Sequence, residues 1–207
     1  MAIMLSWRSE PDTGGGLESA RITTAGGGFR AVGRMIRGVP GLPGGVLTAS
    51  YRLVVAGDGS LSRLAVDVAT AGGEQQLTIS RSTDGVWLVD DGSGGTRGEF
   101  HGARDVDLAF SPVFDALPIR RLGLHRDRGE HVVPMVVVDL PTLRVEATEQ
   151  VYRTVRAGTA AEPAVVGFEA GGVSAQAAGT MTQMTVDDDG FVIDYPGLAA
   201  RTELPAG

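Results

Sequence analysis

The chain of 207 residues contains no cysteine and no lysine, and all 18 of its basic residues are arginines. Without cysteine there can be no disulfide, no thiolate nucleophile and no cysteine-ligated metal. Without lysine, Schiff-base catalysis and the lysine of a phosphate-binding loop are excluded. The histidines, His101, His125 and His131, are too scattered in the sequence for a histidine-rich metal site. We therefore expect no metal or other cofactor.

Long apolar runs are missing as well. None approaches the length of a membrane span, and Met1–Trp7 lacks the basic start and apolar core of a secretory signal. These absences predict a cytoplasmic protein without membrane insertion. The formal net charge of -7 disfavours nucleic acid and anionic membrane surfaces as partners. No G-x-S-x-G motif marks a nucleophile elbow.

What the sequence does contain is a regular alternation of apolar and polar residues. Every second residue is apolar from Leu47 to Val55 and again from Leu64 to Val68, which is typical of half-buried strands. Glycine-rich turns such as Gly57–Gly59 separate such segments, and Val39–Gly45 is a loop long enough to act as a flap. Further strands are expected at Leu17–Thr24, Phe29–Arg37, Leu77–Ile79, Val132–Leu140, Leu143–Arg156, Val165–Ala170, Val173–Asp187 and Phe191–Tyr195.

This pattern predicts a single all-β domain over residues 1–207, with roughly a dozen strands in an antiparallel meander. A sheet of that size usually curls or splits, which protects its edges. We expect a barrel-like or half-barrel sheet around an interior cavity, and a two-sheet sandwich is the alternative. Any helix should be short, and Gly98–Arg104 is the candidate segment.

The least generic stretch of the chain is residues 105–124. If it begins as a strand, Asp105 and Asp107 point to the same face. Its two prolines predict a rigid loop or sheet edge, because each fixes φ and removes a backbone donor. Arg120 and Arg121, as neighbours on a strand, would face opposite ways. We predict that both aspartates and one arginine meet in a polar cluster beside an apolar cavity, where they bind a ligand or anchor the loop.

The predicted strand Leu143–Arg156 carries a second group of candidates. One face is mostly apolar but includes Glu149, and a carboxylate in the core needs a partner or a raised pKa. A β-bulge that turns Glu149 outward is the alternative. Gln150 and Tyr152 share the other face, where they could offer hydrogen bonds and a ring to a sugar.

The central stretch resembles the signature of a bacterial family labelled "putative glycolipid-binding proteins", close to D-x-D-L-x-x-[ST]-P-x-x-[ND]-x-L-P-I-R-R-L. Asn is usual in that signature where this chain has Asp115. Further family-like features lie around it in order: Trp7, Glu18, Tyr51, Trp87, Pro141–Leu143, Gln150–Tyr152 and Val186–Leu198. The resemblance spans nearly the whole chain and implies a fold and a lipid or glycolipid ligand.

Two classes of function follow. The first is non-enzymatic binding of a lipid or glycolipid in a β-barrel cavity whose polar end holds the head group. Its candidate contacts are Asp105, Asp107, Asp115, Arg120, Arg121, Glu149, Gln150, Tyr152, Trp87 and Tyr195, although the last two aromatic residues are also typical core anchors. The alternative is an enzyme acting on a bulky amphiphile, with Asp105 and Asp107 as general acid and base. The sequence leaves the oligomeric state open.

Overall fold

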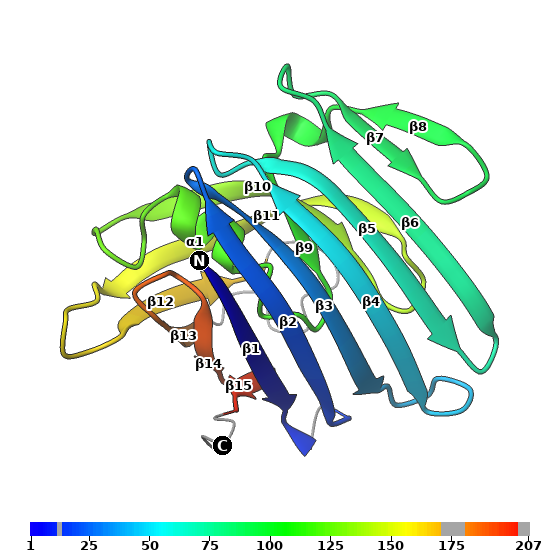
Figure 1. The fold of residues 1–207 in the computed structure, drawn as a ribbon, viewed down its shortest axis with the longest axis horizontal. Coiled ribbons are helices and arrows are strands. Elements are labelled where there is room, and N and C mark those ends of the chain that lie inside the picture. Colours follow the sequence, from blue (N-terminus) through cyan, green and yellow to red (C-terminus); the bar gives the residue numbers. More distant parts are fainter. Residues whose placement is uncertain (12–13, 171–180, 203–207) are drawn as a thin grey trace.

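The protein is one large sheet that curls around its own core (Figure 1). The fold is that of a computed structural model, which describes residues 1–11, 14–170 and 181–202. The strands follow the order β8-β7-β6-β5-β4-β3-β2-β1-β15-β14-β13-β12-β11-β10-β9. They are β1 (Ala2–Ser9), β2 (Gly16–Ala25), β3 (Gly28–Gly38), β4 (Val46–Val55), β5 (Leu61–Thr70), β6 (Gly73–Arg81), β7 (Trp87–Asp90), β8 (Gly95–Gly98), β9 (Asp105–Leu108), β10 (Glu130–Val138), β11 (Val145–Arg156), β12 (Ala164–Glu169), β13 (Thr182–Val186), β14 (Val192–Tyr195) and β15 (Ala199–Arg201).

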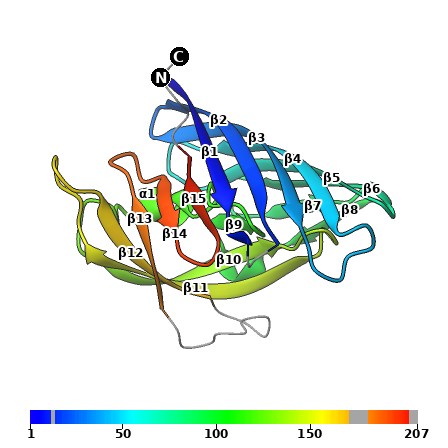
Figure 2. The ribbon, with the colours of Figure 1, turned by 90° about the horizontal axis from the view of Figure 1, so that it is seen from below.

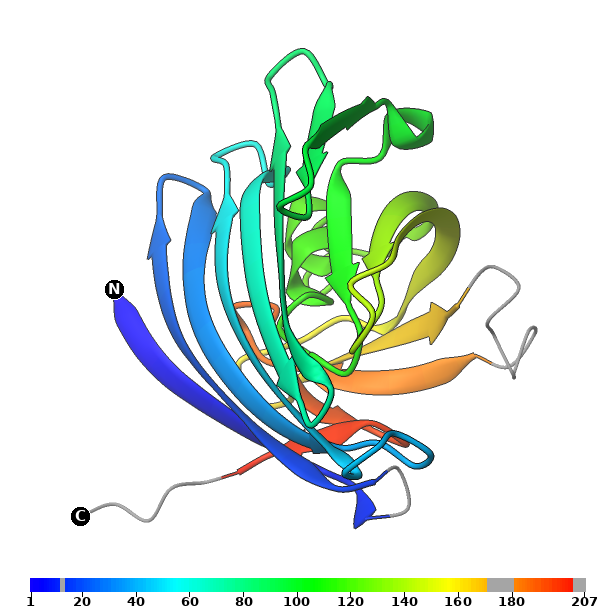
Figure 3. The ribbon, with the colours of Figure 1, turned by 90° about the vertical axis from the view of Figure 1, so that its right-hand side faces the viewer.

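The predicted all-β class is confirmed, and so is the curling of the sheet. Figure 3 shows β1 to β6 bending around an interior that also contains β9 and the short helix α1 (Ala116–Arg121). The sheet does not close, because β8 and β9 are its two ends and neither pairs with the other. A single continuous sheet also rules out the two-sheet sandwich in the described part of the chain. The result is an open, barrel-like wall with an interior.

The alternation of residues decides which side of each strand faces that interior. On β3 and β4 every second side chain is buried, as the sequence predicts. Glycine is required at one of these positions: a Cβ on Gly33 would lie 2.1 Å from Cζ of Tyr51. The missing side chain lets the tyrosine ring cross the neighbouring strand and reach the centre of the molecule.

The central motif departs from the meander. β9 pairs in parallel with β10, and the connection between them contains the helix α1 (Ala116–Arg121). Parallel neighbours need a crossover, which explains why the chain leaves the sheet here. This helix was not predicted, because it contains Pro118. Proline is tolerated at the third helical position because the first N–H groups of a helix have no intrahelical partner. The expected short helix near Gly98–Arg104 is a 3-10 turn at Phe100–Gly102.

Two other expectations need correction or limits. A proline would be expected at a strand end or a bulge, because it cannot donate to the ladder, but Pro134 lies in the middle of β10 opposite Glu149. The pairing of β10 with β9 begins only at Met135, so no second strand lies beside Pro134. The N–H that proline lacks is therefore not needed for a hydrogen bond there. The predicted strand Val173–Asp187 is described only from β13 onward, and its residues 173–180 lie outside the described residues.

The interior is filled by two apolar clusters. The larger lines the inner side of β1 to β7 and includes Trp7, Tyr51, Trp87 and Phe114. The smaller lies between β10 to β14 and the end of α1 and includes Tyr152. Val39 and Leu42 of the predicted flap pack against the larger cluster. None of the helices in the described ranges has the length and apolar character needed to cross a membrane.

Candidate functional site

The central motif fills one end of the curled sheet. Figure 2 shows α1 and β9 between the arm formed by β1 to β6 and the arm formed by β10 to β13. Val113, Phe114, Leu117 and Ile119 are almost completely buried. The Phe114 ring meets the Tyr51 ring edge-on, with 5.2 Å between centroids. The motif therefore acts as an apolar plug, and its polar side chains must be satisfied inside the molecule.

The first polar network of the plug is an ion pair between Asp105 on β9 and Arg121 on α1. Asp105 is fully buried, and Nε of Arg121 lies 3.2 Å from each carboxylate oxygen while Nη2 makes a closer contact. Burial raises the pKa of Asp105, and the hydrogen bonds and charge of Arg121 oppose this shift. The fork of the guanidinium fits such two-oxygen contact. The pair ties α1 to the sheet.

The second network begins at Asp107 and does not include an arginine. Nε2 of Gln150 donates to Asp107 (2.9 Å), and the Tyr152 hydroxyl lies 3.1 Å from Oε1 of Gln150 and 3.0 Å from Oδ1 of Asp115. Burial and the charge of Asp107 raise the pKa of Asp115 well above its ordinary value. Burial likewise raises the pKa of Asp107.

The number of protons in this network fixes its direction. The Tyr152 hydroxyl has one hydrogen to donate, yet it lies between two oxygen acceptors, on Gln150 and Asp115. If Asp115 is protonated, it donates to Tyr152, which then donates to Gln150, which donates to Asp107. Every group then has a hydrogen-bond partner, and the network carries a single negative charge, on Asp107. The raised pKa of Asp115 agrees with this arrangement.

A third polar group, centred on Glu18 of β2, received no functional role in the sequence analysis. Oε1 of Glu18 accepts hydrogen bonds from the hydroxyls of Tyr51 (2.6 Å) and Ser111 (2.7 Å), and Oε2 has no partner among the described residues. Burial raises the pKa of Glu18 to about 7, although both hydroxyls and the charge of Arg37 oppose the shift. The sequence could have indicated Glu18, because it is a carboxylate on the same strand face as the apolar residues Ala20 and Ile22.

The remaining predicted contacts are scattered. Arg120 bonds to the Asp189 carbonyl and lies over the rings of Phe29 and Phe191. Trp87 is fully buried and donates from Nε1 to the carbonyl of Ala103, so it is a core anchor. Tyr195 is half-buried, and its ring lies 5.9 Å from that of Phe168. The structure thus brings together only part of the predicted set.

Glu149 does not lie in the core, and it points outward without the β-bulge that the alternative required. Its side chain is exposed, and the pairing of β10 with β11 runs through this position without a bulge. The polar face of β11 is the inner one: Gln150 and Tyr152 are buried, whereas Val155 on the apolar face is 43% exposed. At this place the interior contains the network around Asp107. Polar side chains on the inner face of β11 can form the hydrogen bonds that these buried groups need, whereas apolar side chains could not.

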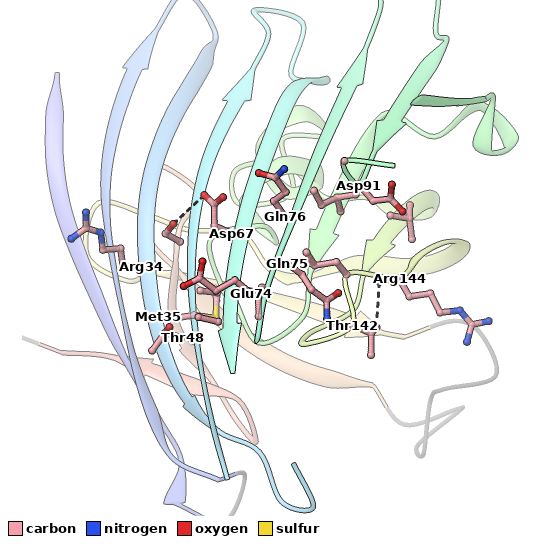
Figure 4. A pocket seen from close by; sticks show the side chains of 18 of the residues that line it. Arg34, Met35, Thr48, Asp67, Glu74, Gln75, Gln76, Asp91, Thr142 and Arg144 are labelled. Atoms are coloured by element: carbon pink, nitrogen blue, oxygen red, sulfur yellow. Dashed lines mark hydrogen bonds between the residues drawn. The ribbon is translucent and has the colours of Figure 1, made fainter. Parts of the chain in front are cut away.

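The large cavity of the protein lies elsewhere (Figure 4). It is open and measures about 1280 Å³. On one side it is bordered by the ends of β3 to β6 that lie away from the plug, and on the other by the turn before β11. Its floor consists of core side chains, namely Met35, Ala49, Val68, Leu77 and Leu143. Its rim is polar and includes Arg34, Thr48, Asp67, Glu74, Gln75, Gln76, Asp91, Thr142 and Arg144.

None of the ten predicted contact residues borders this cavity. Arg121 borders two smaller ones of about 170 and 130 Å³, and Arg120 borders the first of these. The predicted single cluster beside an apolar cavity is therefore two neighbouring networks inside the plug. The sequence did not reveal the cavity residues, because they come from six separate segments, and each looks like an ordinary strand or turn.

Comparison with known proteins supports the family resemblance of the chain. No curated protein matches the chain. A crystal structure of a DUF1089 family protein from Pseudomonas aeruginosa superimposes with a TM-score of 0.73 at 25% identity, covering 90% of this chain and 92% of that one. A beta-barrel-like protein of the domain of unknown function DUF1849 from Brucella abortus matches at 10% identity, TM-score 0.47, covering 97% and 93%. Residues 4–201 match the family described as "Putative glycolipid-binding", and the chain belongs to that family.

Proposed function

We propose that the protein binds a lipid or glycolipid in the open cavity beside β6. The observation that carries this proposal is the division of the cavity into an apolar floor and a polar rim. An amphiphile needs both surfaces, because its chain gains from leaving water while its head group must keep hydrogen bonds. The family description points to the same class of ligand.

The size of the cavity suits a large ligand. Pockets for small molecules usually enclose about 300–1,000 Å³, and this open cavity measures about 1280 Å³. Apart from Arg34, whose side chain lies on the outer face of β3, the rim carries one arginine, three carboxylates and several amides and hydroxyls. Such a rim offers both donors and acceptors, which fits a head group with many hydroxyls.

We assign the two networks of the plug to anchoring rather than to ligand contact. Asp105 is bonded to Arg121, and Asp107 to Gln150, so their oxygens already have protein partners. An enzyme using these carboxylates as acid and base would need a substrate within hydrogen-bond reach. Neither residue borders the large cavity or the two smaller ones. The geometry therefore favours binding without catalysis.

The test is to fill the cavity with a side chain. Gln75 is exposed on β6, shares the strand face of Leu77 and borders the cavity. We expect Gln75→Trp to weaken binding of dodecyl maltoside, measured by calorimetry below its micelle concentration, by about tenfold or more. Gln183→Trp is the matched control, since Gln183 is exposed on β13 and does not border the cavity.

Two outcomes would reject the proposal. One is a wild-type protein that binds no dodecyl maltoside and carries no lipid in native mass spectrometry after purification from its own host. The other is equal binding by Gln75→Trp and Gln183→Trp. Thermal unfolding of both variants should match that of the wild type, because both positions are exposed.

A further inference from the structure

The outer face of β1 to β4 carries positive charge only. Arg8, Arg21, Arg30, Arg34 and Arg52 are all exposed on these strands. The acidic residue within the same four strands is Glu18, which points inward and is 4% exposed. The whole chain, in contrast, has a formal net charge of -7. Charge is therefore segregated, with a cationic face on an acidic protein.

The same face is also unusually apolar for an exposed surface. Met4 and Ile36 are each 57% exposed, Val32 is 52% exposed and Leu17 is 48% exposed. A solvated sheet face normally carries polar side chains on its outer side. Figure 1 looks onto this face, with α1 and β9 to β11 lying behind it.

Cations and apolar side chains alternate across the strands. The pairing places Met4 beside Arg21, Arg21 beside Val32, and Val32 beside Arg52. A second row places Arg8 beside Leu17, and Leu17 beside Ile36. With strands about 4.8 Å apart, four neighbouring strands form a patch about 14 Å wide. Its apolar and cationic groups are intimately mixed.

We propose that this face docks on the surface of an anionic lipid bilayer. Surfaces that lie on membranes combine basic residues with apolar side chains, which enter the boundary between head groups and acyl chains. Arginine suits this role because its apolar stem can follow a neighbouring Val or Ile while its guanidinium reaches a phosphate. The patch therefore supplies both parts of interfacial binding, and the net charge of the chain does not oppose it locally.

The bilayer explains the observations better than an acidic protein partner does. A protein partner would bring carboxylates and a complementary apolar patch at fixed positions, whereas the exposed side chains here alternate evenly over two rows. The proposal itself stands on the outer face and does not require the cavity to bind a lipid.

The experiment is co-sedimentation with vesicles made of equal parts phosphatidylcholine and phosphatidylglycerol. We expect the wild type to bind these vesicles and to bind pure phosphatidylcholine weakly, with added salt reducing the difference. Near an anionic surface each arginine is worth a factor of about five in affinity. Arg21→Gln combined with Arg52→Gln should therefore weaken binding about 25-fold.

A second arginine pair gives the matched control. Arg97 and Arg128 are exposed and lie outside β1 to β4, so Arg97→Gln with Arg128→Gln changes the net charge equally. This pair should keep nearly full binding. Val32→Thr with Ile36→Thr tests the apolar part and should lower binding several-fold without changing its salt dependence.

The proposal is overturned if the wild type does not bind the anionic vesicles, or if the two arginine pairs weaken binding equally. The first result would leave an acidic protein as the partner of this face. The second would mean that binding follows net charge alone. Failure here is distinguishable from failure of the cavity proposal, because vesicle binding and dodecyl maltoside binding are read separately and respond to different variants.

Discussion

Asp115 can donate the hydrogen bond that an asparagine side chain would donate at the same position. The family resemblance led us to expect Asn at this position. A protonated aspartate donates a hydrogen bond as an amide does, and Asp115 lies 3.0 Å from the Tyr152 hydroxyl with a raised pKa. We therefore infer that the neutral acid takes the place of the amide, and that the departure from the signature conserves the hydrogen bond.

This inference predicts the effect of Asp115→Asn on the pH dependence of stability. Because the folded-state pKa of Asp115 is raised, the folded protein retains a proton that the unfolded chain loses above its ordinary pKa. Wild-type stability should therefore fall, relative to the variant, as pH rises, by up to about 1.4 kcal/mol per pH unit.

Urea unfolding at several pH values measures this difference. Asp115→Leu should destabilise the protein at every pH, since it leaves Tyr152 without that partner. Asp194→Asn, at an exposed position on β14, is the control for the same exchange at the surface. A difference for Asp115→Asn that does not change with pH would mean that Asp115 is ionised in the folded protein.

At the scale of elements, α1 and the loop before it determine how the curled sheet is filled. The segment crosses from β9 to β10 and brings Leu117 and Ile119 against the inner sides of both arms. Ion pairing of Arg121 with Asp105 then fixes the helix to its own strand. A plug of this kind depends more on its apolar contacts than on the ion pair, because burying both charges is itself costly.

Replacing Leu117 with Ala tests the plug. Leu117 is 1% exposed, so the cavity left behind should destabilise the protein by roughly 2–5 kcal/mol. Leu88 on β7 is 42% exposed, and Leu88→Ala should cost much less. Chemical denaturation gives both values. A change within about 0.5 kcal/mol for Leu117→Ala would show that the segment lies on the surface.

At the scale of the whole molecule, continuity of the sheet depends on its shortest strand. β15 joins β1 to β14, so the N-terminal and C-terminal halves of the wall meet there. Arg201 strengthens the junction with an ion pair to Asp187 (2.8 Å) and lies over the Trp7 ring. The two arms therefore should unfold together rather than as separate units.

Ala200→Pro tests this junction, because Ala200 pairs with Arg8 on one side and with Asp194 on the other. Proline removes a backbone donor between two neighbouring strands, so we expect a loss of more than about 3 kcal/mol. Ala200→Val keeps the donor and favours a strand, and it should leave stability nearly unchanged. If Ala200→Pro unfolds at the same urea concentration as the wild type, the arms do not depend on β15.

Much of the fold could be predicted from the sequence because strand formation depends on local alternation. The period of two and the glycine turns located most strands, and a long, specific motif indicated the family. Burial at alternate positions of β3 and β4 followed directly from that pattern. The expectation of a cytoplasmic protein stays a prediction.

Tertiary structure decided the rest, because it depends on which distant segments meet. The inner face of β11 is polar only because Asp107 and Asp115 lie opposite it, so local apolarity pointed to the wrong side. Likewise, Arg120 and Arg121 lie on a helix and not on the strand that the sequence suggested. The position of this helix decides that Arg121 reaches Asp105, whereas Arg120 reaches the Asp189 carbonyl. The cavity and the cationic outer face come from side chains of several strands, and no single stretch of sequence contains enough of either to reveal it.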